Sequence, residues 1–145
     1  HRYRATPDER AAAADHRADL AHTTDSYFYA ITDAYLKSFP EARIVQLHGF
    51  HHEKLLKKGI EVVVSNGTDE PQDVTRRDTA LLRKQLGADS VALYPDDVRK
   101  YGASANTIGR LVRLTQRGQF LHLELSPGLR DALEADVTPL RVIVK

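Results

Sequence analysis

The sequence contains no cysteine, no methionine and no tryptophan, and its formal net charge is only +1. Without cysteine the chain can form neither a disulfide framework nor a thiolate metal site, so any metal must be held by His, Asp or Glu. A charge this close to zero argues against nucleic acid or an acidic membrane as a partner. No apolar run is long enough to cross a membrane. The composition predicts a soluble protein and leaves the compartment open, secretion and the periplasm included.

The length bounds the domain organisation. The chain has 145 residues, of which 41% are hydrophobic and 28% charged, which is enough for one domain with a substantial core. We therefore expect residues 1–145 to form a single domain. The chain begins at His1 and has no methionine, which predicts a processed product or a fragment. An upstream part of the same domain is therefore one expected partner.

Hydrophobic periodicity predicts alternating helices and strands. Helices are expected over residues 24–38, 71–86, 106–116 and 127–134. Strands are expected over residues 44–48, 59–65, 90–94, 120–126 and 140–144. In the first helix Phe28, Ile31 and Tyr35 recur at spacings of three and four and are predicted to face the core. This order predicts an α/β fold with a mixed, mostly parallel sheet sandwiched between helices.

Two of the predicted strands carry side chains with metal or acid–base chemistry. Residues 120–126 alternate strictly, so His122 and Glu124 face away from the leucines between them. They either form the wall of a site or are ordinary polar residues on an exposed face. His48 ends a short apolar strand and precedes Gly49. That position is typical of a ligand at a strand tip, and equally of a histidine that only caps the strand.

A polar run near the N-terminus is a further candidate. It holds two His-x-x-Asp pairs, His16/Asp19 and His22/Asp25, with Arg17 in the first. A helix would place each pair on one face. The run either lines a polar pocket or forms a solvated turn.

Three parts of the sequence resemble one family. Leu123-Glu124-Leu125-Ser126, followed by Gly128-Leu129-Arg130, is similar to the terminal motif of poly-γ-glutamate hydrolase-like zinc enzymes, and Asn106 with Gly109-Arg110 resembles the region before it. Gln46-Leu47-His48-Gly49 resembles the strand-tip zinc ligand of the zinc carboxypeptidase-like superfamily, which includes N-formylglutamate amidohydrolases. Ala18-Asp19-Leu20-Ala21-His22 is similar to a segment of bacterial members of this superfamily.

The resemblance implies a zinc-dependent hydrolase that cleaves an amide bond in a small peptide or other carboxylate-bearing substrate. It implies His48 as a zinc ligand and Glu124 as the general base. The residues that it implies for substrate binding are Asn106, Arg110 and Arg17. Further candidates at the site are His22, Asp19 and His122.

The sequence departs from the superfamily at its first ligand pair. No His-x-x-Glu occurs before His48. Either that pair lies upstream of His1, which we favour, or His16/Asp19 or His22/Asp25 replaces it. The missing pair motivates a second hypothesis, a non-catalytic α/β binding or interaction module derived from the same fold. A third hypothesis is metal binding without catalysis by histidines between His16 and His52.

Overall fold

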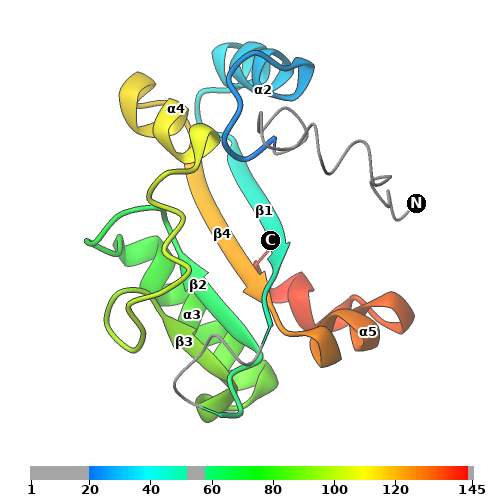
Figure 1. Cartoon of the computed structure of the whole chain (residues 1–145). Coiled ribbons are helices and arrows are strands. Elements are labelled where there is room, and N and C mark those ends of the chain that lie inside the picture. Colours follow the sequence, from blue (N-terminus) through cyan, green and yellow to red (C-terminus); the bar gives the residue numbers. More distant parts are fainter. Residues whose placement is uncertain (1–19, 52–57, 144–145) are drawn as a thin grey trace.

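The computed structural model describes residues 20–51 and 58–143, which form an α/β fold (Figure 1). Along the chain the elements are α2 (Tyr27–Ser38), β1 (Arg43–Gly49), β2 (Val62–Ser65), α3 (Asp73–Leu86), η3 (Ala88–Ser90), β3 (Val91–Leu93), α4 (Thr107–Thr115), β4 (Gln119–Leu125), α5 (Pro127–Ala135) and η4 (Thr138–Ile143). None of the helices in these ranges is long and apolar enough to span a membrane.

The strands of the described ranges form one four-stranded sheet in the order β1-β4-β2-β3. β1 runs parallel to β4 and β2 runs parallel to β3, whereas β4 and β2 are antiparallel. The sheet is therefore mixed and mostly parallel, as the sequence predicted. β4 lies between β1 and β2 and is covered on both faces: of its seven residues only Gln119 is exposed.

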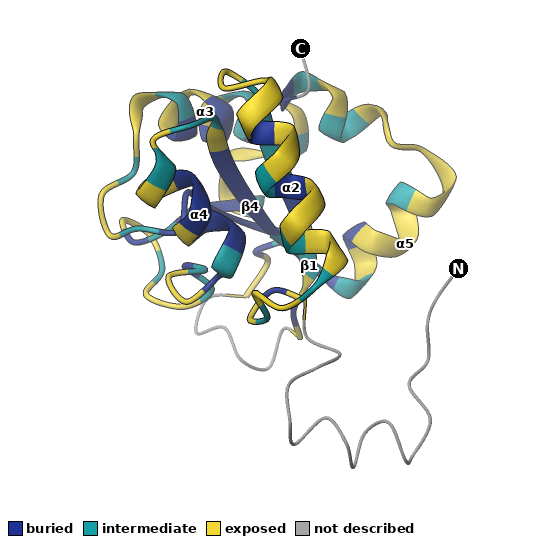
Figure 2. Ribbon diagram, turned by 90° about the horizontal axis from the view of Figure 1, so that it is seen from above, coloured by how far each residue is buried: buried dark blue, intermediate teal, exposed yellow. Residues whose placement is uncertain are grey.

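Helices cover both faces of the sheet (Figures 1 and 2). On one face the leucines of β4 pack with Val62 and Val64 of β2 and with α3, α5 and η4. On the other face Phe120 packs against Leu36 of α2 and against Ile108 of α4. Beyond Phe120 on this second face come His122 and Glu124, because successive side chains of a strand alternate between faces.

Local capping fixes the starts of α5, which follows β4, and of α4, which precedes it. The Ser126 hydroxyl accepts a hydrogen bond from the Leu129 N–H at 3.0 Å, and Pro127 occupies the first turn of α5. The same hydroxyl donates to the Glu61 carboxylate. The Asn106 side chain accepts from the N–H groups of Ile108 and Gly109 at the start of α4. These caps account for the predicted helix boundaries near residues 106 and 127.

A charged pair ties the sheet to one helical layer. Arg43, at the start of β1, pairs with Asp78 of α3, whose side chain is only 2% exposed. The Arg43 guanidinium also donates to the Ile143 carbonyl at 2.8 Å, so β1, α3 and η4 meet at this side chain. Removing the Arg43 charge would leave the buried Asp78 carboxylate without its partner, which is destabilising.

Two expectations from the sequence are wrong. The helix near residue 31 forms, but Ile31 is 68% and Tyr35 48% exposed, and the side chains that α2 buries are Thr32 and Leu36. Thr32 is accommodated because its hydroxyl donates to the Phe28 carbonyl at 2.8 Å.

The strand predicted for residues 140–144 is also wrong: residues 138–143 form the 3-10 helix η4. The Asp136 carboxylate accepts from the Thr138 N–H at 2.8 Å, and Pro139 suits a first helical turn. Val142 and Ile143 still pack against the core, so their apolar character is used in another conformation.

Candidate metal centre

The register of the two parallel strands brings the predicted residues together. His48 of β1 lies beside Glu124 of β4, and Gln46 lies beside His122. Because these positions share one face of the sheet, His48, His122 and Glu124 form a cluster whose ligand atoms lie within 4.8 Å of one another. Over residues 20–51 and 58–143 it is the one group of three or more such side chains that could hold a metal ion.

The cluster is compact and largely shielded from water. The His122 Nε2 lies 3.7 Å from a Glu124 carboxylate oxygen, and these side chains are 3% and 12% exposed. The His48 and His122 rings lie with their centroids 4.8 Å apart and tilted by 53°. His48, on the edge strand β1, is half-buried. The cluster therefore opens to its surroundings through His48.

Several buried polar atoms here make no hydrogen bond within the described part of the protein. They are the His122 Nδ1, the second oxygen of Glu124 and the Tyr101 hydroxyl. A buried polar atom left unsatisfied costs about 1–3 kcal/mol, and native proteins seldom tolerate it without a functional reason. Imidazole nitrogens and a carboxylate are ligands for zinc and other borderline metals. The donor set and its unsatisfied atoms therefore fit a metal ion.

The environment shifts the pKa values of the cluster in opposite directions. Burial, with the neighbouring His48, lowers the pKa of His122 to about 3, so its imidazole is neutral and able to ligate a metal. Burial raises the pKa of the Glu124 carboxyl, and the Arg130 charge partly opposes this. A carboxyl with a raised pKa is suited to receive a proton.

Tyr101 is a site residue that sequence reasoning missed. Its ring packs on Phe50 with centroids 5.3 Å apart, and its backbone has a left-handed φ of 64°. Burial, followed by the Glu124 charge, raises the pKa of its hydroxyl. The sequence offered only a tyrosine before Gly102 in a polar loop, and a non-glycine residue held at positive φ is a signal that only structure provides.

Arg130 lies near enough to the cluster for its charge to act on Glu124. It belongs to α5 and is exposed, and its Nε donates weakly to the Ser126 carbonyl at 3.4 Å. Its guanidinium rests on Gly49, where an added Cβ would lie 2.6 Å from Nη1. A glycine after His48 is therefore needed for this arginine to approach the end of β1.

The other predicted residues lie elsewhere. Asn106 is buried and donates to the Gln46 side chain at 2.6 Å, so its amide is used inside the fold. Arg110 is exposed on α4, and His22 is exposed near the start of the described chain. Neither belongs to the cluster. Arg17 and Asp19 lie outside the described residues, as do His16 and His52.

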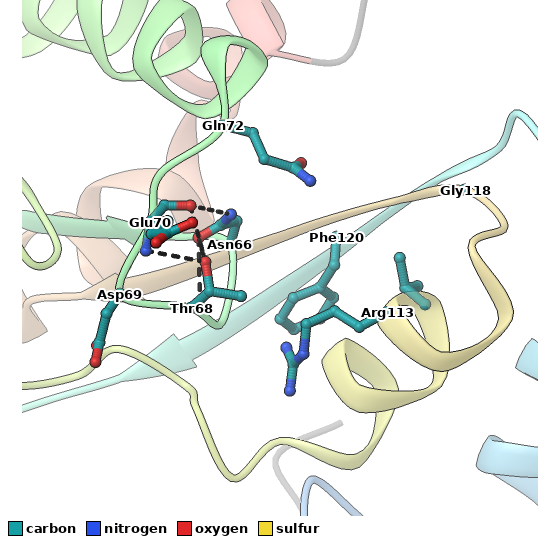
Figure 3. A pocket seen from close by; sticks show the side chains of 9 residues that line it. Asn66, Thr68, Asp69, Glu70, Gln72, Arg113, Gly118 and Phe120 are labelled. Carbon is teal, nitrogen blue, oxygen red and sulfur yellow. Dashed lines mark hydrogen bonds between the residues drawn. The ribbon is translucent and has the colours of Figure 1, made fainter.

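A separate cavity of about 450 Å³ lies beside the other end of β4 (Figure 3). It is lined by Asn66, Thr68, Asp69, Glu70, Gln72, Val112, Arg113, Gly118 and Phe120. Hydrogen bonds among Asn66, Thr68 and Glu70 hold the loop that forms one wall. Since no cluster residue lines it, this cavity is not part of the candidate metal centre.

The fold and the cluster define an α/β protein with a candidate metal centre on one face of its sheet. No protein-family model, curated protein or solved structure matches the chain. Its function therefore has to be argued from the geometry of the site.

Proposed function

We propose that the protein is a zinc-dependent hydrolase that cleaves an amide bond in a small carboxylate-bearing substrate. The observation that carries the proposal is the cluster of His48, His122 and Glu124 with its unsatisfied buried atoms. It unites a histidine pair suited to zinc with a carboxylate suited to proton transfer, and the sequence resemblance pointed to the same two strands.

Zinc bound here would polarise the scissile carbonyl and make water more acidic. Glu124 takes the proton of the attacking water and passes it to the amine as the carbon–nitrogen bond breaks. His122 stays neutral at physiological pH because its pKa is about 3, so it serves as a ligand and not as an acid. The Tyr101 hydroxyl, near Glu124, can donate to the developing negative oxygen.

We assign recognition of the substrate carboxylate to Arg130. An arginine binds a carboxylate through two parallel N–H groups, and the guanidinium of Arg130 is exposed over Gly49 at the end of β1, where its charge acts on Glu124. Arg110 is exposed on α4 and has no such position at the cluster. Binding by Arg17 and Asn106 stays a prediction.

The zinc ligands would not all come from the described residues. A catalytic zinc needs three protein ligands and one open position. If Glu124 acts as the base, His48 and His122 supply only two, so we propose that a further ligand comes from an upstream part of the same domain. The alternative is that Glu124 itself ligates the metal, and the protein is then a binding module without a general base.

Substitution of Glu124 by Gln distinguishes these two functions. We expect the zinc content of Glu124→Gln to equal that of the wild type, and hydrolysis of N-acyl amino acids and γ-glutamyl peptides to fall by at least about 100-fold. Glu41→Gln, an exposed glutamate away from the cluster, is the matched control and should keep both. Full activity in Glu124→Gln would refute the base, and loss of zinc would favour the binding module.

A further inference from the structure

A cavity lies where the connections that leave the carboxyl ends of β2 and β3 diverge. The chain leaves β2 for α3, which packs with the leucines of β4, and leaves the neighbouring β3 for α4, which packs on the opposite face of the sheet. The cavity of about 450 Å³ opens directly after β2, between the loop that begins at Asn66 and the side chains of Val112 and Arg113 on α4. Open α/β sheets bind ligands outside the carboxyl ends of strands whose connections diverge in this way. The cavity therefore has the position of a binding site.

Part of the cavity wall is apolar. Phe120 of β4 and Val112 of α4 line it, and both side chains are buried. In the view of Figure 3 the Phe120 ring lies between the side chain of Gln72, at the start of α3, and that of Arg113 on α4. Small-molecule sites have volumes of about 300–1,000 Å³ and combine apolar walls with a few polar groups. The cavity meets both conditions.

The loop that forms the polar wall is held in place by its own hydrogen bonds. The Thr68 hydroxyl donates to the Glu70 carbonyl at 2.8 Å and accepts from the Glu70 N–H at 3.2 Å. The side-chain amide of Asn66, which is buried, donates to the same carbonyl at 3.1 Å. Because this wall is already ordered, a ligand that binds against it does not have to order the loop, and this favours affinity.

Two polar side chains of the lining have no partner in the described part of the chain. The backbone of Glu70 binds Asn66 and Thr68, but its carboxylate makes no hydrogen bond or ion pair with residues 20–51 or 58–143. Gln72 precedes α3 without capping it, and its side-chain amide makes no hydrogen bond with these residues either. Both side chains are exposed, so a carboxylate and an amide are open to a ligand at the cavity.

The other charged groups of the lining are already engaged. The Asp69 carboxylate accepts a hydrogen bond from the Tyr94 hydroxyl at 2.5 Å. The Arg113 guanidinium donates to the Gly67 carbonyl at 3.0 Å. One guanidinium against the two carboxylates of Asp69 and Glu70 leaves the lining with a formal charge of −1. This charge disfavours an anion and favours a cation, and the unpartnered carboxylate of Glu70 is the group that can receive it.

We propose that this cavity binds a small organic amine, with its ammonium group on the Glu70 carboxylate and its apolar body against Phe120 and Val112. A hydrogen bond from an ammonium group to a carboxylate is charge-assisted, and an aromatic ring also attracts a cation. The Gln72 amide both donates and accepts, so it suits a hydroxyl or carbonyl group on the same ligand. Since no residue of the candidate metal centre lines the cavity, the proposal does not depend on the proposed function.

NMR titration of the protein in the presence of a chelator tests the proposal without zinc or hydrolysis. Three probes of similar shape differ in charge: phenethylamine is a cation, phenethyl alcohol is neutral and hydrocinnamate is an anion. The amine should shift the amide signals of Thr68, Gln72 and Val112 and leave that of His48 unchanged. We expect it to bind at least about fivefold more tightly than the alcohol, because its hydrogen bond to Glu70 is charge-assisted. The anion should bind more weakly than either.

Two substitutions that each remove one negative charge sharpen the test. In Glu70→Gln the dissociation constant of phenethylamine should rise to that of phenethyl alcohol, whose own affinity should not change because backbone groups hold the loop. Asp89→Asn, at an exposed aspartate before the opposite end of β3, is the matched control and should leave both affinities unchanged. Equal affinity of the wild type for amine and alcohol, tightest binding of hydrocinnamate, or no saturable shift with the amine would overturn the proposal. Full amine affinity in Glu70→Gln would do so too.

Discussion

The two faces of β4 show how one strand serves two purposes. On one face Leu121, Leu123 and Leu125 are at most 4% exposed and pack with α3, α5 and η4. On the other face His122 and Glu124 are almost as well covered, yet each has a buried polar atom that makes no hydrogen bond among residues 20–51 and 58–143. Burial on the leucine face stabilises the fold, and burial on the polar face opposes it.

Within the seven residues of β4, one face stabilises the fold and the other carries the chemically active side chains. The leucine face gains free energy in proportion to the apolar area that it removes from water. The polar face keeps an imidazole neutral and raises the pKa of a carboxyl by the same removal of water. In the metal-free protein, substitutions on the two faces should therefore change the free energy of unfolding in opposite directions.

The largest expected effect is on the leucine face. Leu123 is 0% exposed, so Leu123→Ala should lower the free energy of unfolding by about 3 kcal/mol, through lost burial and the cavity left behind. Urea denaturation measures this. Leu47→Ala, at a 54% exposed leucine of the neighbouring strand, is the control and should change the stability by less than about 0.5 kcal/mol. Equal losses would mean that the faces do not differ as described.

A bound metal should turn the unfavourable contribution of the polar face to stability into a favourable one. Zinc at one hundred times its dissociation constant should raise the free energy of unfolding by about 2.7 kcal/mol, because it binds only the folded cluster. A chelator should remove the gain, and His48→Ala should abolish it. His51→Ala, at an exposed histidine after β1, should retain it. Thermal unfolding with and without zinc measures all four conditions, and a gain that survives in His48→Ala would place the metal elsewhere.

The contrast between an apolar and a polar face of β4 could be predicted from the sequence alone, because leucine occupies every second position between residues 120 and 126. The side chains that other elements bring to the polar face could not be predicted in this way. Whether His48 meets Glu124 depends on the register of β1 against β4, which local sequence does not encode. Tyr101 reaches the site through a backbone conformation that its residue type disfavours.

The errors have a similar origin. The spacing of Ile31 and Tyr35 correctly indicated a helix, but tertiary packing decided that Thr32 and Leu36 face the core. For residues 140–144 the β-branched composition favoured a strand, and the Asp136 cap with Pro139 favoured a helix. A pattern indicates the type of an element, and contacts from distant parts of the chain decide its orientation.

A smaller effect is expected from acid. His122 has a pKa of about 3 in the folded protein against an ordinary 6.5, so the unfolded chain binds a proton that the folded protein does not. Metal-free protein should lose stability as the pH falls below that ordinary value, by about 1.4 kcal/mol per pH unit from this group. His122→Gln should remove that slope in urea denaturation between neutral pH and mild acid. An unchanged slope would show that His122 is not buried in its neutral form.

The smallest effect on stability should come from Glu124, and its pH dependence is opposite to that of His122. Burial raises the pKa of its carboxyl, so in the metal-free protein the folded state holds this proton more tightly than the unfolded state. Stability is therefore lost as the pH rises through the raised pKa, and Glu124→Gln, which cannot ionise, should be slightly more stable than the wild type above that range. The advantage should vanish in acid, where both side chains are neutral. Urea denaturation of both proteins across this pH range measures the difference, and a gap independent of pH would trace it to packing and not to charge.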